Sequence, residues 1–211
     1  MMRAIVQRAY GGTDVLRLQD IAAPAPGPHD VLVGVHAASV NHGDWFATCG
    51  RPYVMRAASG MRGPRVAVRG RDLAGRVEAV GAAVTRFRPG DGVYAETTTG
   101  SFAGLACVPE HLLAPKPANL TFEQAAAVAV AAVTALHGLR DVGEVQPGQA
   151  VLINGASGGV GTFPCRSPRP SAPTSPACAA PATSSWSARS APATSSTTRG
   201  RTSPAAGNAT T

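Results

Sequence analysis

Hydrophobic residues alternate with polar ones, or follow one another almost without interruption, over several short stretches of the first 118 residues. β-branched residues recur in this way in "RAIVQ" at 3–7 and "DVLVGVHAASV" at 30–40, a spacing typical of strands. A further strand is expected at 76–81, and two more within 101–117. Turn residues such as "PGDG" at 89–92 separate these runs. The pattern predicts a β-rich barrel or sandwich over residues 1–118.

The hydrophobic period changes near residue 119. The alanine-rich segment 119–143 predicts a helix, with Thr121 as its N-cap and Gln124 completing a capping box. The apolar run "AVLIN" at 150–154 predicts a strand buried on both faces of a parallel sheet. Because "GASGGVG" follows directly at 155–161, residues 119–163 are expected to begin an α/β nucleotide-binding domain of the Rossmann type.

Residues 164–211 have a different composition, dominated by Ala, Ser, Thr and Pro and without Val, Leu, Ile, Met, Phe, Lys, Asp or Glu. Such a segment buries too little apolar surface to offset roughly 1–2 kcal/mol of backbone entropy per ordered residue. We therefore expect a disordered low-complexity tail. Prolines from 164 onward also oppose the helix that should follow the glycine turn, and we expect the strand at 150–154 to lack neighbouring strands.

The basic character of the chain resides largely in this tail. The net charge is +7, and without the five arginines of 164–211 it falls to +2. A basic-tailed nucleic-acid binder is therefore an alternative function. It is disfavoured, because the arginines are scattered and Trp186 is the only aromatic residue of the tail that could stack on a base. We expect no nucleic-acid partner.

Cysteine usage and the N-terminus bear on location. Cys49 and Cys107 form no CxxC pair, and we interpret them as reduced thiols. No apolar run reaches the roughly 18 residues of a membrane span, and the N-terminus lacks the order of a signal peptide. We expect a cytoplasmic protein without a membrane partner.

The glycines at 155, 158, 159 and 161 do not form a strict GxGxxG motif. Glycine still lets the backbone turn sharply and approach a pyrophosphate, toward which a following helix would direct its N–H groups. A plain turn is the alternative. The preceding strand and capped helix favour dinucleotide binding.

Several longer stretches share one resemblance: "VHAASVNHGDW" at 35–45, "GRDLAGRVEAVG" at 70–81, "LAPKPANLTFEQAAAV" at 113–128 and "VLINGASGGVGTF" at 151–163. In this order they resemble the N-terminal half of a medium-chain dehydrogenase/reductase of the zinc-free quinone oxidoreductase (zeta-crystallin-like) branch. The resemblance implies a GroES-like β-barrel followed by an NADPH-binding Rossmann domain. It also implies hydride transfer to a small electrophilic acceptor, namely a quinone, an enone or a related carbonyl compound. The family is often homodimeric through an edge of the Rossmann sheet, and we expect this edge to be missing here.

The resemblance also implies site residues. Asn41 matches an asparagine near the nicotinamide and the substrate; otherwise it is a loop asparagine that satisfies its own turn. Thr134 matches a helix threonine near the nicotinamide; otherwise it is a buried hydroxyl bonded to its own helix. Tyr53 is either at the substrate entrance or a surface residue. The expected pyrophosphate turn comprises Gly155, Gly158, Gly159, Val160 and Gly161.

Zinc is disfavoured. Zinc-dependent relatives carry Cys near the position of Asn41 and Gly-His-Glu where this chain has Gly70, Arg71 and Asp72. His42 stands alone, whereas catalytic zinc needs three protein ligands. Catalysis would rest on orienting the nicotinamide against an electron-poor acceptor, and no general acid is identified.

The abrupt change after Phe163 is what a one-base deletion would produce. When the last base of each codon is joined to the first two of the next, residues 164–177 can be decoded as "VQIAKALGADVTGV" and residues 195–204 as "VIDYTREDVT", with codons chosen within degeneracy. Both resemble Rossmann-domain segments of the family. We therefore expect an out-of-frame tail and a 211-residue chain with little or no activity. A non-enzymatic GroES-like binding module remains an alternative.

Overall fold

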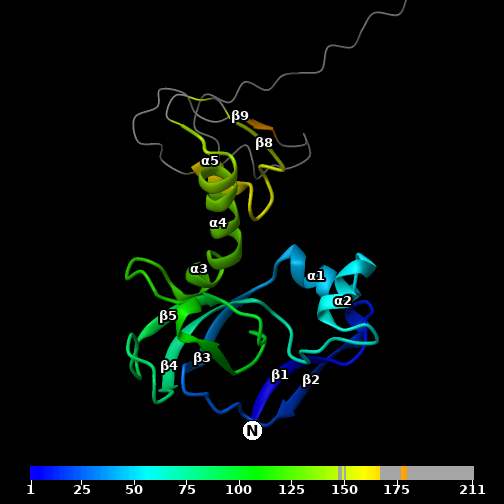
Figure 1. Ribbon diagram of the computed structural model, residues 1–211, viewed down its shortest axis with the longest axis vertical. Helices are drawn as coiled ribbons and strands as arrows, with labels where there is room; N and C mark the ends of the chain where they lie inside the picture. Colours follow the sequence, from blue (N-terminus) through cyan, green and yellow to red (C-terminus); the bar gives the residue numbers. More distant parts are fainter. Residues whose placement is uncertain (147–148, 150, 167–176, 180–211) are drawn as a thin grey trace, which may run out of the picture. The chain divides into compact units, whose positions relative to one another are not determined.

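The structure, a computed structural model, describes residues 1–146, 149, 151–166 and 177–179 (Figure 1). It contains two compact units, 1–143 and 144–211. The elements of the first unit are, in order, β1 (Met2–Gln7), η1 (Thr13–Val15), β2 (Leu16–Ile21), β3 (Asp30–Ser39), α1 (His42–Cys49), η2 (Tyr53–Met55), α2 (Arg56–Ser59), β4 (Asp72–Val80), β5 (Gly92–Glu96), β6 (Leu105–Pro109), η3 (Glu110–Leu112), β7 (Leu113–Pro115), α3 (Phe122–Ala126), α4 (Ala129–Leu136) and the π-helix η4 (His137–Val142).

Five strands of the first unit form one antiparallel sheet in the order β6-β3-β4-β5-β7. The strands expected at 30–40 and within 101–117 are confirmed as β3, β6 and β7. The strand expected at 76–81 lies in β4, which begins earlier, at Asp72. This early start places an acidic residue at the beginning of a central strand.

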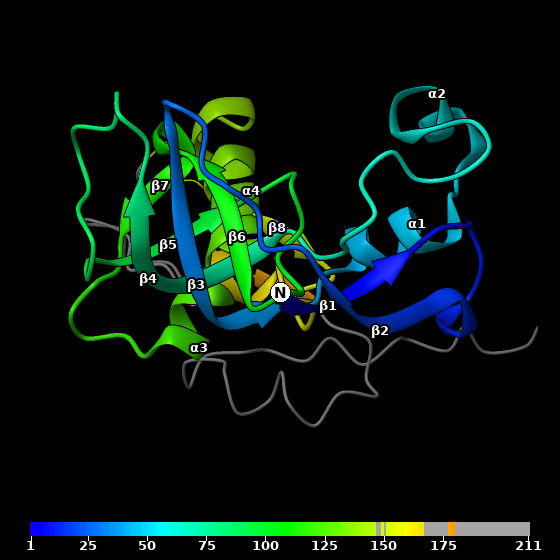
Figure 2. The same cartoon turned by 90° about the horizontal axis from the view of Figure 1, so that it is seen from below.

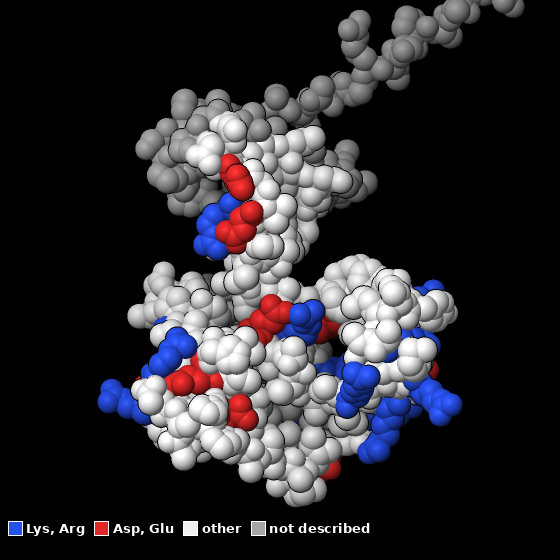
Figure 3. All heavy atoms as spheres, in the orientation of Figure 1, with Lys and Arg blue, Asp and Glu red and all other residues white. Residues whose placement is uncertain are grey.

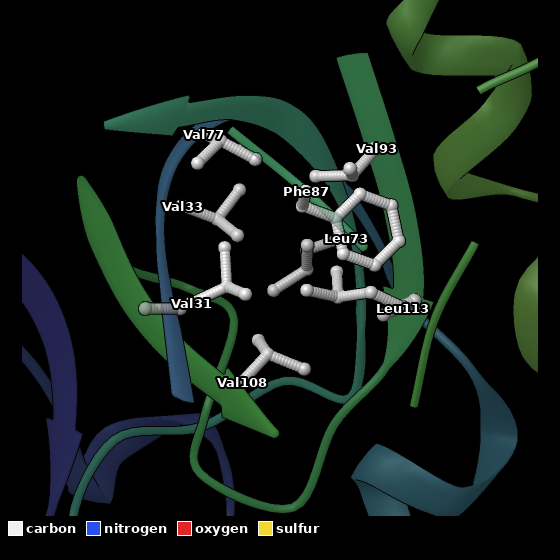
Figure 4. Close-up of a cluster of buried hydrophobic side chains, with 10 residues drawn as sticks. Val31, Val33, Leu73, Val77, Phe87, Val93, Val108 and Leu113 are labelled. Atoms are coloured by element: carbon white, nitrogen blue, oxygen red, sulfur yellow. The ribbon is translucent and has the colours of Figure 1, made fainter. Parts of the chain in front are cut away.

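The core of this unit is aliphatic. Leu73, Val31, Val33 and Val93 are completely buried, and Figure 4 shows their side chains converging between the strands with those of Val77, Phe87, Val108 and Leu113. β3 has alternating buried positions along its first half, as expected for a strand with one face in the core. The hydrophobic pattern of these strands therefore determines which of their faces packs inward.

A second, smaller sheet pairs β1 with β2 in antiparallel register. Single bridges connect Ala4 to Ala103 and Val6 to Val68. Figures 1 and 2 show β1, β2, α1 and α2 together on one side of the unit, with the five-stranded sheet on the other. No helix among the described residues has the length and apolar character that crossing a bilayer requires.

The helical segment that follows the sheet begins at its expected cap. The Thr121 hydroxyl accepts a hydrogen bond from the Gln124 amide, and the Gln124 side-chain oxygen accepts one from the Thr121 amide, which confirms the capping box. The single helix expected over 119–143 is instead divided into α3, α4 and η4. The division falls at Ala127 and Val128, where no proline or glycine marks it in the sequence.

The described part of the second unit contains β8 (Leu152–Asn154), a glycine turn, α5 (Thr162–Arg166) and β9 (Ala177–Ala179). β8 pairs in parallel with β9, so the expectation that this strand has no neighbour was wrong. The expected absence of a helix after Gly161 was also wrong. Pro164 lies in the first turn of α5, where a helix does not need the amide hydrogen that proline lacks.

The strand at 150–154 differs from its prediction in burial. Ile153 is buried, but Leu152 is 74% exposed, so the strand is not buried on both faces. Apart from 164–166 and 177–179, the tail expected to be disordered lies outside the described residues. The domain boundaries at 118 and 163 remain predictions.

Candidate functional site

A buried carboxylate joins three elements of the first unit. Asp72 is fully buried at the start of β4. Its Oδ2 accepts hydrogen bonds from Ser39 Oγ at 2.8 Å and from Asn41 Nδ2 at 2.9 Å. Its Oδ1 accepts one from the Val130 amide at 3.1 Å. Asp72 therefore connects the end of β3, the start of α1 and the first turn of α4.

Burial raises the pKa of the Asp72 carboxyl above its ordinary value of 3.8, while the bonds from Asn41, Ser39 and Val130 oppose that shift. The contact with Val130 also replaces a missing helix cap, because Val128, the N-cap of α4, has no side chain that could accept from the first-turn amides. A negative charge at this helix end is favoured by the helix dipole. Asp72 thus stabilises the start of α4 from the neighbouring sheet.

Asn41 is the N-cap of α1. Its backbone amide donates to Asp44 Oδ2 at 2.8 Å, and its side-chain nitrogen contacts Ser39 Oγ at 3.3 Å in addition to Asp72. Burial raises the pKa of Asp44, partly offset by the bond from Asn41 and by nearby arginines. Asn41 is therefore held in one orientation by two carboxylates. This is compatible with a loop role and with a role in positioning a ligand.

Thr134 lies on α4, one helical turn after Val130, and is exposed. Its hydroxyl makes no hydrogen bond within the described residues, so the alternative of a buried hydroxyl bonded to its own helix does not hold. No hydrogen bond of the described chain joins Thr134 to Asn41. The two are connected indirectly, through Asp72 and Val130.

The predicted pyrophosphate turn lies between β8 and α5 in the second unit. The Gly158 amide bonds to the carbonyl of Gly155 at 2.9 Å, and the Thr162 amide bonds to that of Gly158 at 3.1 Å. At Gly161 a Cβ would lie 2.2 Å from the Gly155 oxygen, so this position needs glycine. In the described chain the amides of Gly159, Val160 and Gly161 donate no hydrogen bond.

Sequence reasoning did not identify Ser39 or Asp72 as members of this cluster. Asp72 entered only as a residue that differs from a zinc-binding pattern. An available signal was its place at the head of the apolar strand "DLAGRVEAV", because a carboxylate buried there needs hydrogen-bond donors. Among the described residues no group of His, Cys, Asp or Glu side chains is arranged to hold a metal ion.

Comparisons with known proteins find similarity to a domain of alcohol dehydrogenases and to quinone oxidoreductases. Residues 27–118 match the family model of the alcohol dehydrogenase GroES-like domain. The quinone oxidoreductase of Lama guanicoe is 38% identical over 169 residues, and that of Pseudomonas aeruginosa is 37% identical over 167. Each alignment covers 79% of this chain and 49% of the relative. The chain thus spans about half the length of the curated relatives it matches.

Solved structures agree with this result. A quinone oxidoreductase from Pseudomonas syringae pv. tomato superposes with a TM-score of 0.69 at 34% identity, covering 78% of this chain and 49% of that one. A mycobacterial protein solved in complex with NADPH gives a TM-score of 0.68 at 32% identity, covering 77% and 48%. These likenesses confirm the expected fold class, a GroES-like domain followed by the start of a Rossmann-like region.

Proposed function

We propose that this chain, which belongs to the medium-chain dehydrogenase/reductase family and matches the N-terminal half of its quinone oxidoreductases, serves NADPH-dependent hydride transfer. The acceptor class is a quinone, an enone or a related carbonyl compound. The observation that carries the proposal is the similarity to quinone oxidoreductases across both the GroES-like domain and the glycine turn.

The residues of the glycine turn fit a dinucleotide. Gly159, Val160 and Gly161 offer backbone amides that have no partner in the described chain, and a Cβ at Gly159 would meet nothing within 4 Å. Free amides between a strand and a helix are the donors that a pyrophosphate requires. Bound NADPH would supply the hydride. The chain's own contribution here is to hold the diphosphate.

In this proposal Asn41 and Thr134 are the residues that position the nicotinamide and the acceptor, as the family resemblance implies. Asp72 contributes indirectly, because it fixes the Asn41 amide and the first turn of α4. Orientation of reactants is the main catalytic effect available without a metal or a general acid.

The test compares two proteins, the 211-residue chain and a chain in which one inserted base after the Phe163 codon restores the proposed frame. NADPH oxidation is followed with 1,4-naphthoquinone. We expect no significant turnover from the first and ~1–10³ per second from the second. Enzyme-like turnover by the 211-residue chain would refute its expected inactivity. A folded, frame-restored protein that binds NADPH but reduces no quinone or enone would refute the acceptor class.

Sequencing of the gene across codons 160–170 tests the frame itself. A missing base relative to a continuous Rossmann-like frame supports the out-of-frame origin of residues 164–211. If the gene has no missing base, and its codons after 163 give no Rossmann-like sequence when read in the shifted frame, the out-of-frame origin of the tail is eliminated.

A non-enzymatic binding module is a second candidate, because residues 1–143 contain their own buried core. The two functions differ in response to cofactor. Binding to the native state raises Tm by mass action, so a Tm that increases with NADPH concentration favours the oxidoreductase. A Tm independent of NADPH in both proteins favours the module.

A further inference from the structure

The first unit contains a second feature, a pocket of about 600 Å³ between α1 and the segments 10–12 and 51–56. Its lining includes four aromatic residues and two arginines: Tyr10, Trp45, Phe46, Tyr53, Arg51 and Arg56. The volume lies within the range of small-molecule sites, about 300–1,000 Å³. Tyr53, for which a place at the substrate entrance was one of two alternatives, lines it, whereas Asn41, Thr134 and the glycine turn do not.

Arg56 is fixed between two aromatic rings. Its guanidinium carbon lies 4.4 Å from the centre of the Tyr10 ring and 4.8 Å from that of Tyr53. Its Nε donates to the Gly50 carbonyl at 2.9 Å, and the Tyr10 hydroxyl donates to the Gly60 carbonyl at 2.8 Å. These contacts hold the cation against a wall of aromatic faces.

Gly50 makes this arrangement possible. The residue has a φ of 61° at the end of α1, and a Cβ there would lie 2.5 Å from Tyr10 Cγ and 2.7 Å from Arg56 Nε. Only glycine has both the backbone freedom and the space for this close approach. The stacking of Arg56 on Tyr10 therefore depends on glycine at position 50.

The positive charge of the pocket is not neutralised. Its lining contains no acidic residue, and neither Arg51 nor Arg56 forms a salt bridge within the described part of the chain. The Arg51 guanidinium carbon lies 5.9 Å from the Tyr53 ring centre. In Figure 3 several basic side chains lie over the part formed by β1, β2, α1 and α2, with few acidic ones visible there.

We propose that this pocket binds a planar aromatic anion. The large hydrophobic side chains Trp45 and Tyr53 are 49% and 65% exposed, so they offer ring surface on which an aromatic ligand would stack. The two guanidinium groups would pair with its sulfonate, carboxylate or phosphate. Neither Asn41 nor Asp72 lines this pocket, and the binding tests below need no NADPH, so their outcome is distinguishable from that of the proposed hydride transfer.

The test is calorimetric titration of the 211-residue chain with naphthalene-2-sulfonate. Its neutral analogue naphthalene-2-sulfonamide and the non-aromatic anion methanesulfonate serve as comparisons. We expect the sulfonate to bind at least about ten-fold more tightly than either, because the sulfonamide lacks the charge-assisted contact and methanesulfonate lacks the ring that stacks. Equal affinity for the sulfonate and the sulfonamide would overturn the assignment of the arginines.

Variants locate the site. Arg51→Gln removes one exposed guanidinium and should weaken naphthalene-2-sulfonate binding about ten-fold. Arg62→Gln, at an exposed arginine outside the pocket, is the matched control and should leave it unchanged. Arg56→Lys keeps the charge but loses the stacked plane, and should weaken binding while the fold persists. If the Arg51 and Arg62 variants lose the same affinity for naphthalene-2-sulfonate, the effect is one of overall charge, and the proposal that the ligand binds in this pocket is overturned.

Protection of a cysteine from alkylation tests the place of binding without measuring affinity. Cys49 lines the pocket, whereas Cys107 lies on β6, and both are free thiols. Naphthalene-2-sulfonate should slow the alkylation of Cys49 by iodoacetamide and leave that of Cys107 unchanged, as measured by peptide mass spectrometry. Equal rates for Cys49 with and without the ligand would contradict binding at this place.

Discussion

The two units of the chain organise their hydrophobic residues differently. In the first, Leu73 and the valines around it are completely buried between strands of one sheet (Figure 4). In the described part of the second, Ile153 is buried while its neighbour Leu152 is 74% exposed. Both segments have apolar sequences. The difference shows that an apolar run forms a core only where other elements provide the surface that covers it.

The largest expected effect is a difference in stability between variants of Leu73 and Leu152. Leu73→Ala should lower the free energy of unfolding by about 3–5 kcal/mol, because it leaves a cavity in a packed core. Leu152→Ala should change the urea midpoint hardly at all, since most of its surface is already in water. Chemical unfolding of both variants, followed by far-UV circular dichroism, makes the comparison. Similar losses for both would show that β8 is buried in solution.

The next effect concerns Asp72. Asp72→Ala leaves the donors of Ser39, Asn41 and Val130 without their buried acceptor, and should lower the free energy of unfolding by about 2–3 kcal/mol. Asp20→Ala, at an exposed position on β2, is the matched control, for which we expect no measurable change. If Asp72→Ala is as stable as the control, the three hydrogen bonds are not formed in solution.

A local effect is expected in the glycine turn. Gly161→Ala places a Cβ 2.2 Å from the Gly155 oxygen, whereas Gly159→Ala meets open space. The first change should open the turn and accelerate hydrogen exchange at the Gly158 and Thr162 amides by about ten-fold, equivalent to about 1.4 kcal/mol. The second should not. Equal exchange rates in both variants would mean that the close approach at Gly161 is absent.

The smallest effect is a dependence on pH. Because the pKa of Asp72 is raised, the folded state holds this proton more tightly than the unfolded state. The stabilisation is therefore complete below the ordinary value of 3.8 and is lost as the pH rises through the folded value. The stability of the parent chain relative to Asp72→Asn should fall across that window.

Glu110 should change the stability with pH in the opposite direction. Hydrogen bonds from the Arg86 and Thr85 amides lower its pKa below the ordinary 4.5, so its contribution is present above that value and is lost as the pH falls. Urea unfolding between pH 3 and 7 of the parent, Asp72→Asn and Glu110→Gln measures both slopes. Slopes of the same sign would contradict one of the two assignments.

Features encoded by neighbouring residues were predicted well. The alternation at 30–40 predicted β3, and the spacing of Thr121 and Gln124 predicted the capping box, because both depend on contacts within a few residues. The fold class also followed from the order of motifs. These signals need no knowledge of what packs against the segment.

Features that depend on distant residues were missed. Asp72 is hydrogen-bonded to Ser39 and Val130, which are 33 and 58 residues away in the sequence. The periodicity of hydrophobic residues does not predict contacts over such separations. The division between α3 and α4 and the pairing of β8 with β9 also depend on tertiary contacts. The roles of Asn41, Thr134 and the glycine turn remain predictions, because a ligand is needed to test them.

The bond from Asp72 to the Val130 amide has a practical consequence for dissecting the molecule. Ala125 and Ala126 of α3 pack on Ala74 of the sheet, two residues after Asp72. A recombinant fragment that stops at residue 118 would expose Ala74 and remove one of the donors to the buried carboxylate. A fragment that ends at Gly143 keeps both contacts, so it is the better starting point for crystallisation or NMR of the first unit.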